Sequence, residues 1–497
     1  MQPKVILIMT DTQRKDMIGY YNNNNQSFTP NLDNLAQESL AFERAYTCQP
    51  VCGPARSALF TGTYPHTNGM FANCMSLNSL TKNIGERLMS EGIHTAYIGK
   101  WHLDGGDYFG DGKCPLGWDP DYWFDMRNYL DKLNEAERLK SRRYQTIFEE
   151  ELSESFTFAH QCSNKAIDFV KKHQEEAYFL TVSYDEPHHP FLAPRSFFEQ
   201  FNNCEFPKSP NMEIEIADFP EHVQLWSKSS NGHGDPIVEQ LGQLGLMACN
   251  SFVDYEIGRV LAAIKENAED AIIIYTSDHG DSLGSHRIQS KGPAMYDEIT
   301  NIPLFIKDPR LQSQGKFINA LASHIDLVPT ILELFDLERP KCIEGKSLVP
   351  ILKDIDCEVN EDIFIEFTRY EIDHDGFGGF QPIRCIVRNG YKLVINLLTT
   401  DELYHLDSDP YEIKNLILDE KYQPIRDKMH DRLIEWMNET RDPFRGYYWQ
   451  RRVWRTDHQE VTWDFTGMTR QRYIEKDEVS QLDYATGLPI TAFVRPK

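Results

Sequence analysis

The sequence predicts an α/β protein built on a large, mixed and mainly parallel sheet sandwiched by helices, with a smaller antiparallel sheet near the C-terminus. Short β-rich runs alternate with helical patterns through the first 355 residues, as in proteins with a parallel sheet. From about residue 356, strand-like runs follow one another with only tight turns between them. We therefore expect an α/β domain over residues 1–355 and a C-terminal subdomain over residues 356–497 with a small sheet, a helix and an extended tail.

The α/β pattern can be followed run by run. We expect strands in the apolar runs at 4–9, 94–99, 178–184, 271–277 and 301–307, and helical patterns at 29–42, 163–173 and 241–265. The helix near Thr29 has Pro30 at its first position, where a missing N–H costs nothing.

The C-terminal pattern consists of IFIEF, RCIVRNGYKLVINL and DELYHLD, which predict consecutive antiparallel strands. The stretch 422–440 then repeats apolar residues at helical spacing and predicts an amphipathic helix. Aromatic and arginine residues mix in the following FRGYYWQRRVWR. We interpret this tail as an arm packed on its own domain or on a neighbouring subunit, in preference to a nucleic-acid contact.

Composition argues against nucleic acid as the main partner. The 497 residues include 76 acidic and 51 basic side chains, for a formal net charge of −25. This charge repels polyanions at long range, so an anionic substrate needs a local cationic pocket. Charge alone leaves the oligomeric state open.

The cysteines and the N-terminus bear on location. Ten cysteines are scattered without a regular framework, which favours free thiols and a reducing compartment. The run Val5–Met9 lacks the flanking features of a signal peptide, and no run approaches the roughly 18 apolar residues of a membrane span. We expect a cytoplasmic protein with no membrane partner, or a periplasmic one if the native N-terminus is longer.

Polar residues follow the carboxyl ends of four predicted strands. These groups are Asp11 and Thr12, Lys100 and His102, His188 and His189, and Asp278 with His279. Parallel strands bring their carboxyl ends to one edge of a sheet, where ligands of open α/β sheets bind. Each group alone has a structural explanation as a helix cap or a packed histidine, whereas four together predict a site.

The predicted site has the composition of a hard-metal centre beside cationic groups. Asp11, Asp278 and His279 suit Ca²⁺, with Mg²⁺ or Mn²⁺ as alternatives, better than structural zinc. Lys100 and Lys291 would bring positive charge to an anionic group. A divalent cation beside two lysines is what the transfer or hydrolysis of a sulfuryl or phosphoryl group requires.

A candidate nucleophile lies in TCQPVCGPARSALFTG, where Cys52, Pro54 and Arg56 form C-x-P-x-R. This motif resembles the signature of the type I sulfatases of the alkaline phosphatase superfamily, whose cysteine is converted to formylglycine by a maturation enzyme. GKWHLDG at 99–105, PHHP at 187–190, SDHGD at 277–281 and LYHLDSDPYEIKNL at 403–416 extend the resemblance. It implies an alkaline phosphatase-like fold and hydrolysis of sulfate esters. A redox or metal pair of Cys48 and Cys52 has no second cysteine pair to support it.

The resemblance assigns the metal and the nucleophile. It implies that Asp11, Asp278, His279 and the oxidised Cys52 bind a divalent metal, while Arg56 holds the formylglycine oxygens. Hydrated formylglycine would supply the attacking hydroxyl and later release sulfate as the aldehyde re-forms.

The resemblance also assigns the surrounding groups. Lys100 and Lys291 would hold sulfate oxygens, and His102 would be the base for sulfate release. His188 would contact the sulfate or protonate the leaving alcohol, with His189 as the neighbouring alternative.

Two positions depart from the commonest pattern of the resemblance. Thr12 stands where many sulfatases carry a second aspartate, and His279 stands where asparagine is frequent. Thr12 could coordinate the metal through its hydroxyl or leave the place to water. Similar substitutions occur in phosphodiesterases and phosphonate monoester hydrolases of the superfamily, which are the first alternative function. A silent binding protein in which Cys52 stays a thiol is the second.

The loop 367–384, FTRYEIDHDGFGGFQPIR, is the candidate for selecting the leaving group. Polar groups for binding sugar hydroxyls are Arg369, Tyr370, His374 and Asp375, with Phe377 or Phe380 as a stacking face. Asp104 and Asp107 are second candidates, with a solvated loop as their structural explanation. We expect a small sulfated sugar as substrate, and a plain structural turn is the alternative for the loop.

Overall fold

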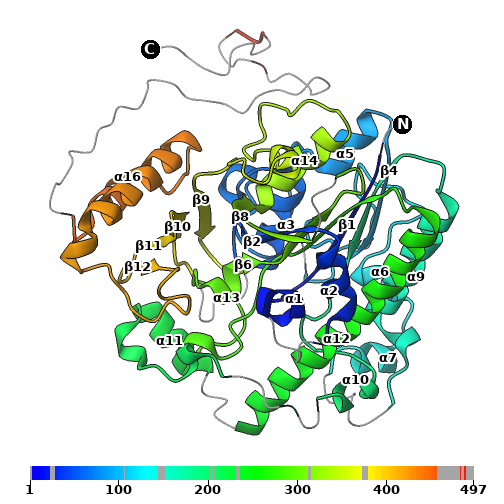
Figure 1. Ribbon diagram of the computed structural model, residues 1–497, viewed down its shortest axis with the longest axis horizontal. Helices are drawn as coiled ribbons and strands as arrows, with labels where there is room; N and C mark the ends of the chain where they lie inside the picture. Colours follow the sequence, from blue (N-terminus) through cyan, green and yellow to red (C-terminus); the bar gives the residue numbers. More distant parts are fainter. Residues whose placement is uncertain are drawn as a thin grey trace.

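The protein is described from a computed structural model, over residues 3–22, 28–105, 107–143, 151–201, 204, 208–230, 236–311, 315–371, 379–455, 482 and 486–488, without the side chains of 230 and 236–241. Within these residues a large sheet has the strand order β3-β4-β1-β5-β7-β2-β6, with β8 beside β2 (Figure 1). Its strands are β1 Lys4–Thr10, β2 Leu40–Tyr46, β3 His94–Gly99, β4 Tyr178–Ser183, β5 Ile272–Ser277, β6 Asn301–Ile302, β7 Leu304–Lys307 and β8 Lys316–Ser323.

The sheet is mixed and mainly parallel, as the alternation of runs predicts. β3, β4, β1 and β5 pair in parallel, and so do β2 and β8. β7 pairs antiparallel with both β5 and β2.

Both faces of the sheet are covered, because successive residues of each strand point to opposite sides. Ile6 and Ile8 of β1 belong to one core cluster, and Val5, Leu7 and Met9 belong to another. The first cluster is covered by α2 Pro30–Gln37, α6 Met126–Asp131, α9 Phe158–Lys172, α10 Arg195–Glu199 and α12 Pro236–Asn267 (Figure 1). The second is covered by α3 Cys52–Thr61, α5 Ile84–Ser90, α14 Leu327–Leu334 and α15 Val349–Lys353.

A second sheet lies in the C-terminal part, with the antiparallel order β12-β11-β10-β9. Its strands are β9 Ile363–Phe367, β10 Ile383–Arg388, β11 Tyr391–Asn396 and β12 Glu402–His405. One face packs on α16 Gln423–Glu439, whose Met429, Leu433 and Met437 are buried as the helical spacing predicts (Figure 1). The division of the chain at residue 355 stays a prediction, because the other face of this sheet shares a core with the large one.

That shared core includes Ile365 and Cys385 of the small sheet and Tyr46 of β2. It also includes Tyr296, the residue just before helix α13 Asp297–Thr300. A buried lysine of β11 strengthens the junction. The Nζ of Lys392 donates to the backbone carbonyl of Met295 at 2.7 Å and pairs with Asp297 and Glu412. The small sheet thereby fixes the segment that follows Lys291.

Two differences from the expected elements have local causes. The helical pattern at 29–42 ends as helix at Gln37, because Leu40–Phe42 pair with β7 and β8 as the start of β2. The aromatic and arginine arm forms α17 Tyr447–Gln450 and packs on its own C-terminal part through buried Trp449 and Trp454. The expectation of an arm packed on its own domain holds as far as Arg455.

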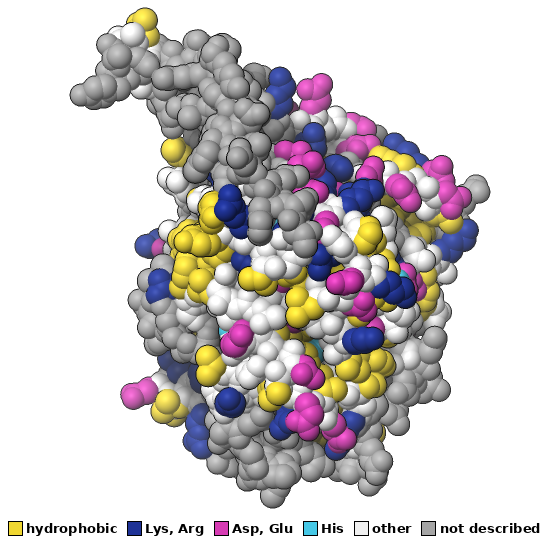
Figure 2. Space-filling view, turned by 90° about the vertical axis from the view of Figure 1, so that its left-hand side faces the viewer, with side chains coloured by type: hydrophobic (Ala, Val, Ile, Leu, Met, Phe, Trp, Pro, Cys, Tyr) yellow, Lys and Arg dark blue, Asp and Glu magenta, His cyan; other side chains and the backbone are white. Residues whose placement is uncertain are grey.

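The surface beside the small sheet carries both signs of charge. Figure 2 looks onto the side that bears α16 and β12, where basic and acidic side chains are interspersed. On α16, Arg432 pairs with Asp362, Glu435 and Glu439. All ten cysteines are free, as expected for most of them. Within the described residues, no helix combines the length and the apolar character that crossing a bilayer would take.

Candidate active site

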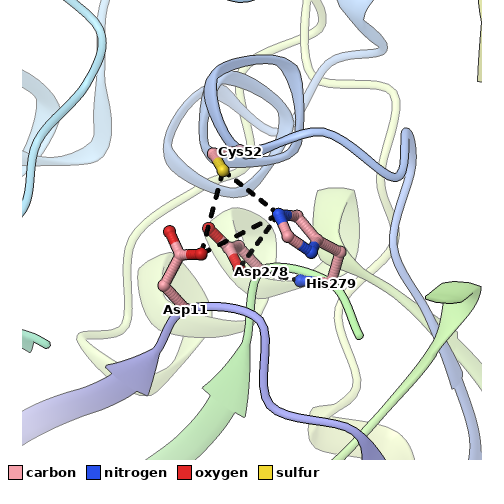
Figure 3. A group of neighbouring side chains, drawn as sticks. All are labelled: Asp11, Cys52, Asp278 and His279. Atoms are coloured by element: carbon pink, nitrogen blue, oxygen red, sulfur yellow. Dashed lines mark hydrogen bonds and ion pairs between the residues drawn. The ribbon is translucent and has the colours of Figure 1, made fainter. Parts of the chain in front are cut away.

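Four side chains from three elements meet at the carboxyl edge of the large sheet. Asp11 follows β1, and Asp278 and His279 follow the neighbouring β5, whose residues run in register with β1. Cys52 is the first residue of α3 and points from the opposite side into the same space (Figure 3). The strand-end argument thus brings together the predicted metal and nucleophile residues.

The ligand atoms of these four buried residues all lie within 4.8 Å of one another. The Sγ atom of Cys52 lies 3.2 Å from Nε2 of His279 and 3.8 Å from Oδ1 of Asp11. The Nδ1 atom of His279 faces the carbonyl of Gly280 at 2.8 Å, so Nδ1 carries the proton and Nε2 presents its lone pair to the carboxylates. Two carboxylates and one imidazole lone pair form a donor set that fits a divalent cation.

Arg56 ties the two carboxylates together. Its guanidinium, fully buried, donates to Oδ2 of Asp278 at 3.0 Å and to Oδ2 of Asp11 at 3.2 Å. The Nη1 atom of Arg56 donates to the backbone carbonyl of Lys100 and to the hydroxyl of Ser183. The structure places Arg56 behind the ligands, where it orients the carboxylates more directly than it contacts the Cys52 side chain.

The two carboxylates differ in pKa. Burial alone would raise the pKa of Asp11, but Lys100, His188 and Arg56 lower it well below its usual value. Burial and the charge of Asp11 raise the pKa of Asp278 to about 7. Asp278 resists ionisation because its negative charge would be buried next to that of Asp11. A bound cation would offset both negative charges, so it can take the place of the Asp278 proton.

Lys100 lies among three partners. Its Nζ is 2.6 Å from Asp11, 3.1 Å from Asp185 and 2.5 Å from the hydroxyl of Tyr108. The Tyr108 hydroxyl donates to Asp185 and lies 3.2 Å from Nδ1 of His188. The structure therefore holds the predicted sulfate-binding lysine in a network that includes two residues outside the predicted set.

Lys291 and His188 form the opposite wall. The Nζ of Lys291 donates to Nε2 of His188 at 2.7 Å and reaches the Thr12 hydroxyl at 3.5 Å. Thr12 in turn donates to Oδ1 of Asp11 at 2.7 Å, so its hydroxyl is turned toward the metal ligands. His189 is exposed and stacks edge-on against Phe191, which leaves His188 as the histidine of the site.

His102 occupies the wall near Tyr108 with its ring edge-on at 5.2 Å. Both ring nitrogens are buried without a hydrogen-bond partner among the described residues. Burial and the charges of Lys100 and Arg56 lower its pKa well below the usual value, so the ring is neutral at physiological pH. A neutral, unpartnered imidazole in this place can accept a proton.

The predicted substrate residues are only partly placed. Tyr370 lies beside the site, since its backbone carbonyl accepts the N–H of Asn73, whose side chain holds Gly53 next to Cys52. Burial raises the pKa of the Tyr370 hydroxyl to about 12. Arg369 is half-buried, and Phe380 is exposed. His374 and Asp375, together with Phe377, lie outside the described residues.

The second substrate candidates have structural partners. Asp104 accepts from the backbone of Asp111, and Asp107 accepts from the backbone of Phe109 and pairs with Arg127. These contacts match the structural explanation of both acids as members of a loop.

Sequence reasoning missed Tyr108, Asp185 and Asn73. Asp185 is the second residue after β4, so the strand-end rule that selected Asp11 could have found it. Tyr108 comes from an irregular loop and has no such signal. Asn73 accepts the N–H of Gly53 at 2.9 Å and so steadies the first turn of α3.

The fold and the site together define a hydrolase of an anionic ester: a metal-type donor set, a nucleophile position and two lysines at one sheet edge. The comparisons identify the family. The sulfatase family profile matches residues 3–337, and the C-terminal profile of N-sulphoglucosamine sulphohydrolase matches residues 284–439. The chain belongs to the sulfatase family and is a sulfuric ester hydrolase.

Known relatives agree with this assignment. The uncharacterized sulfatase YidJ of Escherichia coli K12 is 42% identical over 98% of this chain and 97% of its own. The N-acetylglucosamine-6-O-sulfatase of Bacteroides thetaiotaomicron is 25% identical over 89% of this chain and 87% of its own. Among solved structures, the phosphonate monoester hydrolase of Agrobacterium radiobacter shares the fold with a TM-score of 0.74, at 22% identity over 88% of this chain and 96% of its own.

Proposed function

We propose that this sulfatase hydrolyses the sulfate ester of a small sugar, using formylglycine made from Cys52 beside a divalent cation. The observation that carries the proposal is the position of Cys52. Its Sγ stands where a formylglycine oxygen would lie, 3.2 Å from His279 Nε2 and within reach of Asp11. The thiol itself is a poor nucleophile here, because burial and the charge of Asp11 raise its pKa.

The cation would be held by Asp11, Asp278 and His279, with the oxidised residue 52 and the Thr12 hydroxyl as further oxygen donors. Carboxylate and hydroxyl oxygens favour Ca²⁺, and the imidazole leaves Mg²⁺ and Mn²⁺ as alternatives. When present, formylglycine supplies a hydroxyl that attacks sulfur and a second one through which sulfate is released, while the cation supplies positive charge at the attacking oxygen.

The protein's own side chains bind and orient the ester. Lys100 and Lys291 offer two ammonium groups to the sulfate oxygens, and their charges stabilise the negative charge that develops in the transition state. Arg56 fixes Asp11 and Asp278 through its two charged hydrogen bonds. The maturation enzyme that converts Cys52 is the implied protein partner.

Two histidines handle protons. His102 accepts the proton whose loss releases sulfate, since its neutral ring has both nitrogens free of partners among the described residues. His188 keeps Nε2 as an acceptor from Lys291. When a sulfate ester draws Lys291 to its oxygens, Nε2 becomes free to take up a proton from solvent and to pass it to the leaving alcohol.

A sulfated sugar as substrate is supported by the relative that acts on N-acetylglucosamine 6-O-sulfate and by Tyr370, a hydroxyl beside the site. A panel of sulfated mono- and disaccharides tests this choice. Turnover of lipophilic aryl sulfates with none of the sugars would contradict it.

The formylglycine is tested on the peptide Ala45–Arg56 of the enzyme from its natural host, by mass spectrometry. We expect residue 52 with its sulfur replaced by an aldehyde oxygen, and Cys48 unchanged as an internal control. An intact thiol at residue 52 in active enzyme would refute the mechanism.

Phosphodiester or phosphonate ester hydrolysis is the second candidate. It is favoured by Thr12, which replaces a carboxylate in the donor set with a neutral hydroxyl. Turnover of an aryl sulfate and of an aryl phosphodiester by one preparation separates the two. A larger kcat/KM for the sulfate supports the first proposal.

A further inference from the structure

A second group of metal-ligating side chains lies at the opposite end of the large sheet. His94 is the first residue of β3, His173 caps the end of α9, and Glu176 lies in the turn from α9 to β4. The six residues of β3 separate His94 from Lys100, which amounts to roughly 20 Å along the strand. This group is therefore independent of the active site.

The three side chains converge on one point. Oε2 of Glu176 lies 3.3 Å from Nδ1 of His94 and 3.2 Å from Nδ1 of His173. Ligands bound about 2.0 to 2.1 Å from a tetrahedral zinc ion are separated from one another by about 3.3 Å. Both separations match the edge of such a tetrahedron, and all three ligand atoms lie within 4.8 Å of one another.

His94 has a carboxylate at each ring nitrogen. Its Nε2 lies 2.8 Å from Asp119, and its Nδ1 faces Glu176. A neutral imidazole has one proton, which can satisfy only one of these carboxylates. The other nitrogen would then present its lone pair to a carboxylate oxygen, a repulsive contact that either a second proton or a metal ion removes.

We propose that His94, His173 and Glu176 bind a transition-metal ion of the zinc class, with solvent completing the coordination. Two imidazoles and one carboxylate are typical zinc ligands. Asp119 would accept the Nε2 proton of His94, which fixes the tautomer that offers Nδ1 to the metal. The ion would join the start of β3 to the α9–β4 turn and stabilise that end of the sheet.

The surroundings favour an ordered site. The His173 ring packs against Phe169 at 4.5 Å and Tyr122 at 5.5 Å, so one side of the group is apolar. The side-chain exposures of His94, His173 and Glu176 are 25%, 17% and 55%, which leave an open path from solvent.

A similar group elsewhere lacks the room for an ion. Glu154, His160 and Glu256 also lie close together. There the guanidinium of Arg259 lies 3.1 Å from Nδ1 of His160 and 2.6 Å from Glu256, so a cation is already in place. His160 thus provides a matched control.

The test is a calorimetric titration of Zn²⁺ into the full-length enzyme loaded with Ca²⁺, so that zinc at the catalytic centre is the same in every variant compared. We expect His173→Gln and His94→Gln each to lose one equivalent of bound Zn²⁺, while His160→Gln keeps it. Asp119→Asn should bind that equivalent about ten- to a hundredfold more weakly. Sulfatase activity should be unchanged in all four variants.

Co²⁺ provides a readout that a merely structural role of the histidines would not produce. With Co²⁺ the native enzyme should show the absorption band of a tetrahedral site. The variant Glu176→Gln, changed at an exposed residue, should lack this band, while its melting temperature without added metal equals that of the native enzyme. Equal zinc stoichiometry in the native protein and His173→Gln would overturn the proposal. So would a histidine pair that takes up a proton on acidification and binds no metal at neutral pH.

Discussion

Replacing Tyr108 with phenylalanine isolates the contribution of one hydroxyl to the arrangement of Lys100 and His188. The change keeps the ring, which packs edge-on against His102 at 5.2 Å and lies 4.1 Å below the Lys100 ammonium. It removes a hydrogen bond from Lys100 and one to Asp185. Hydrogen bonds to charged groups contribute about 1.5 to 3 kcal/mol.

Lys100 keeps its contacts with Asp11 at 2.6 Å and Asp185 at 3.1 Å, so we count the loss of one such bond. We therefore expect kcat/KM to fall about ten- to a hundredfold, at one factor of ten for each 1.4 kcal/mol. The fall should lie mainly in kcat if Tyr108 positions Lys100 for the transition state.

The assay is aryl sulfate turnover across a range of pH, on enzyme whose formylglycine content has been measured. The control is Tyr122→Phe, which removes a hydroxyl that contacts Asp168 at 3.5 Å, outside the site. That variant should stay within twofold of the native enzyme. A Tyr108→Phe enzyme as active as the control would refute the positioning role, and a matching fall in melting temperature would attribute the loss to folding.

Three further changes test other parts of the structure. Burial raises the pKa of Glu186 to about 8, so the native state holds the Glu186 proton more tightly than the unfolded state does. The free energy of unfolding should therefore fall as the pH rises from about 4.5 to about 8. Glu186→Gln should raise the melting temperature at pH 8 but not at pH 4, and an equal gain at both pH values would contradict the raised pKa. Arg384→Met leaves buried Asp442 without its cation, and denaturant unfolding should show a loss of about 3 to 5 kcal/mol, whereas a loss below 1 kcal/mol would mean that solvent reaches the pair. Removal of the metal with a chelator should abolish turnover, and added Ca²⁺ should restore it. The affinity for Ca²⁺ should weaken as the pH drops below about 7, because Ca²⁺ must displace the proton of Asp278. A Ca²⁺ affinity independent of pH would show that Asp278 is not a ligand.

The sequence was most informative where chemistry and topology coincide. Asp11 and Asp278 each follow an apolar run, and the parallel pairing of β1 and β5 brings them together without any detail of side-chain packing. Cys52 was recognisable from its neighbours Pro54 and Arg56. The small sheet was also predictable, because turn residues separate its strands at short intervals.

The remaining parts of the site depend on tertiary structure. Tyr108 reaches Lys100 from a loop whose path no periodic pattern describes. The expected role of Arg56 toward the formylglycine stays a prediction, and its buried contact with both carboxylates is visible only in the coordinates. Likewise, the neighbours His188 and His189 look alike in the sequence, while one pairs with Lys291 and the other faces solvent.

The junction at Lys392 has a consequence for dissecting the chain. Its ammonium comes from the small sheet and holds the carbonyl of Met295 and the carboxylate of Asp297, close behind Lys291. A fragment cut at residue 355 would keep the proposed ligands and nucleophile but would lose the support under one of the two lysines proposed to bind the sulfate. Such a fragment should be a poor catalyst even if it folds, and exchanging the C-terminal part between relatives should alter activity as well as specificity.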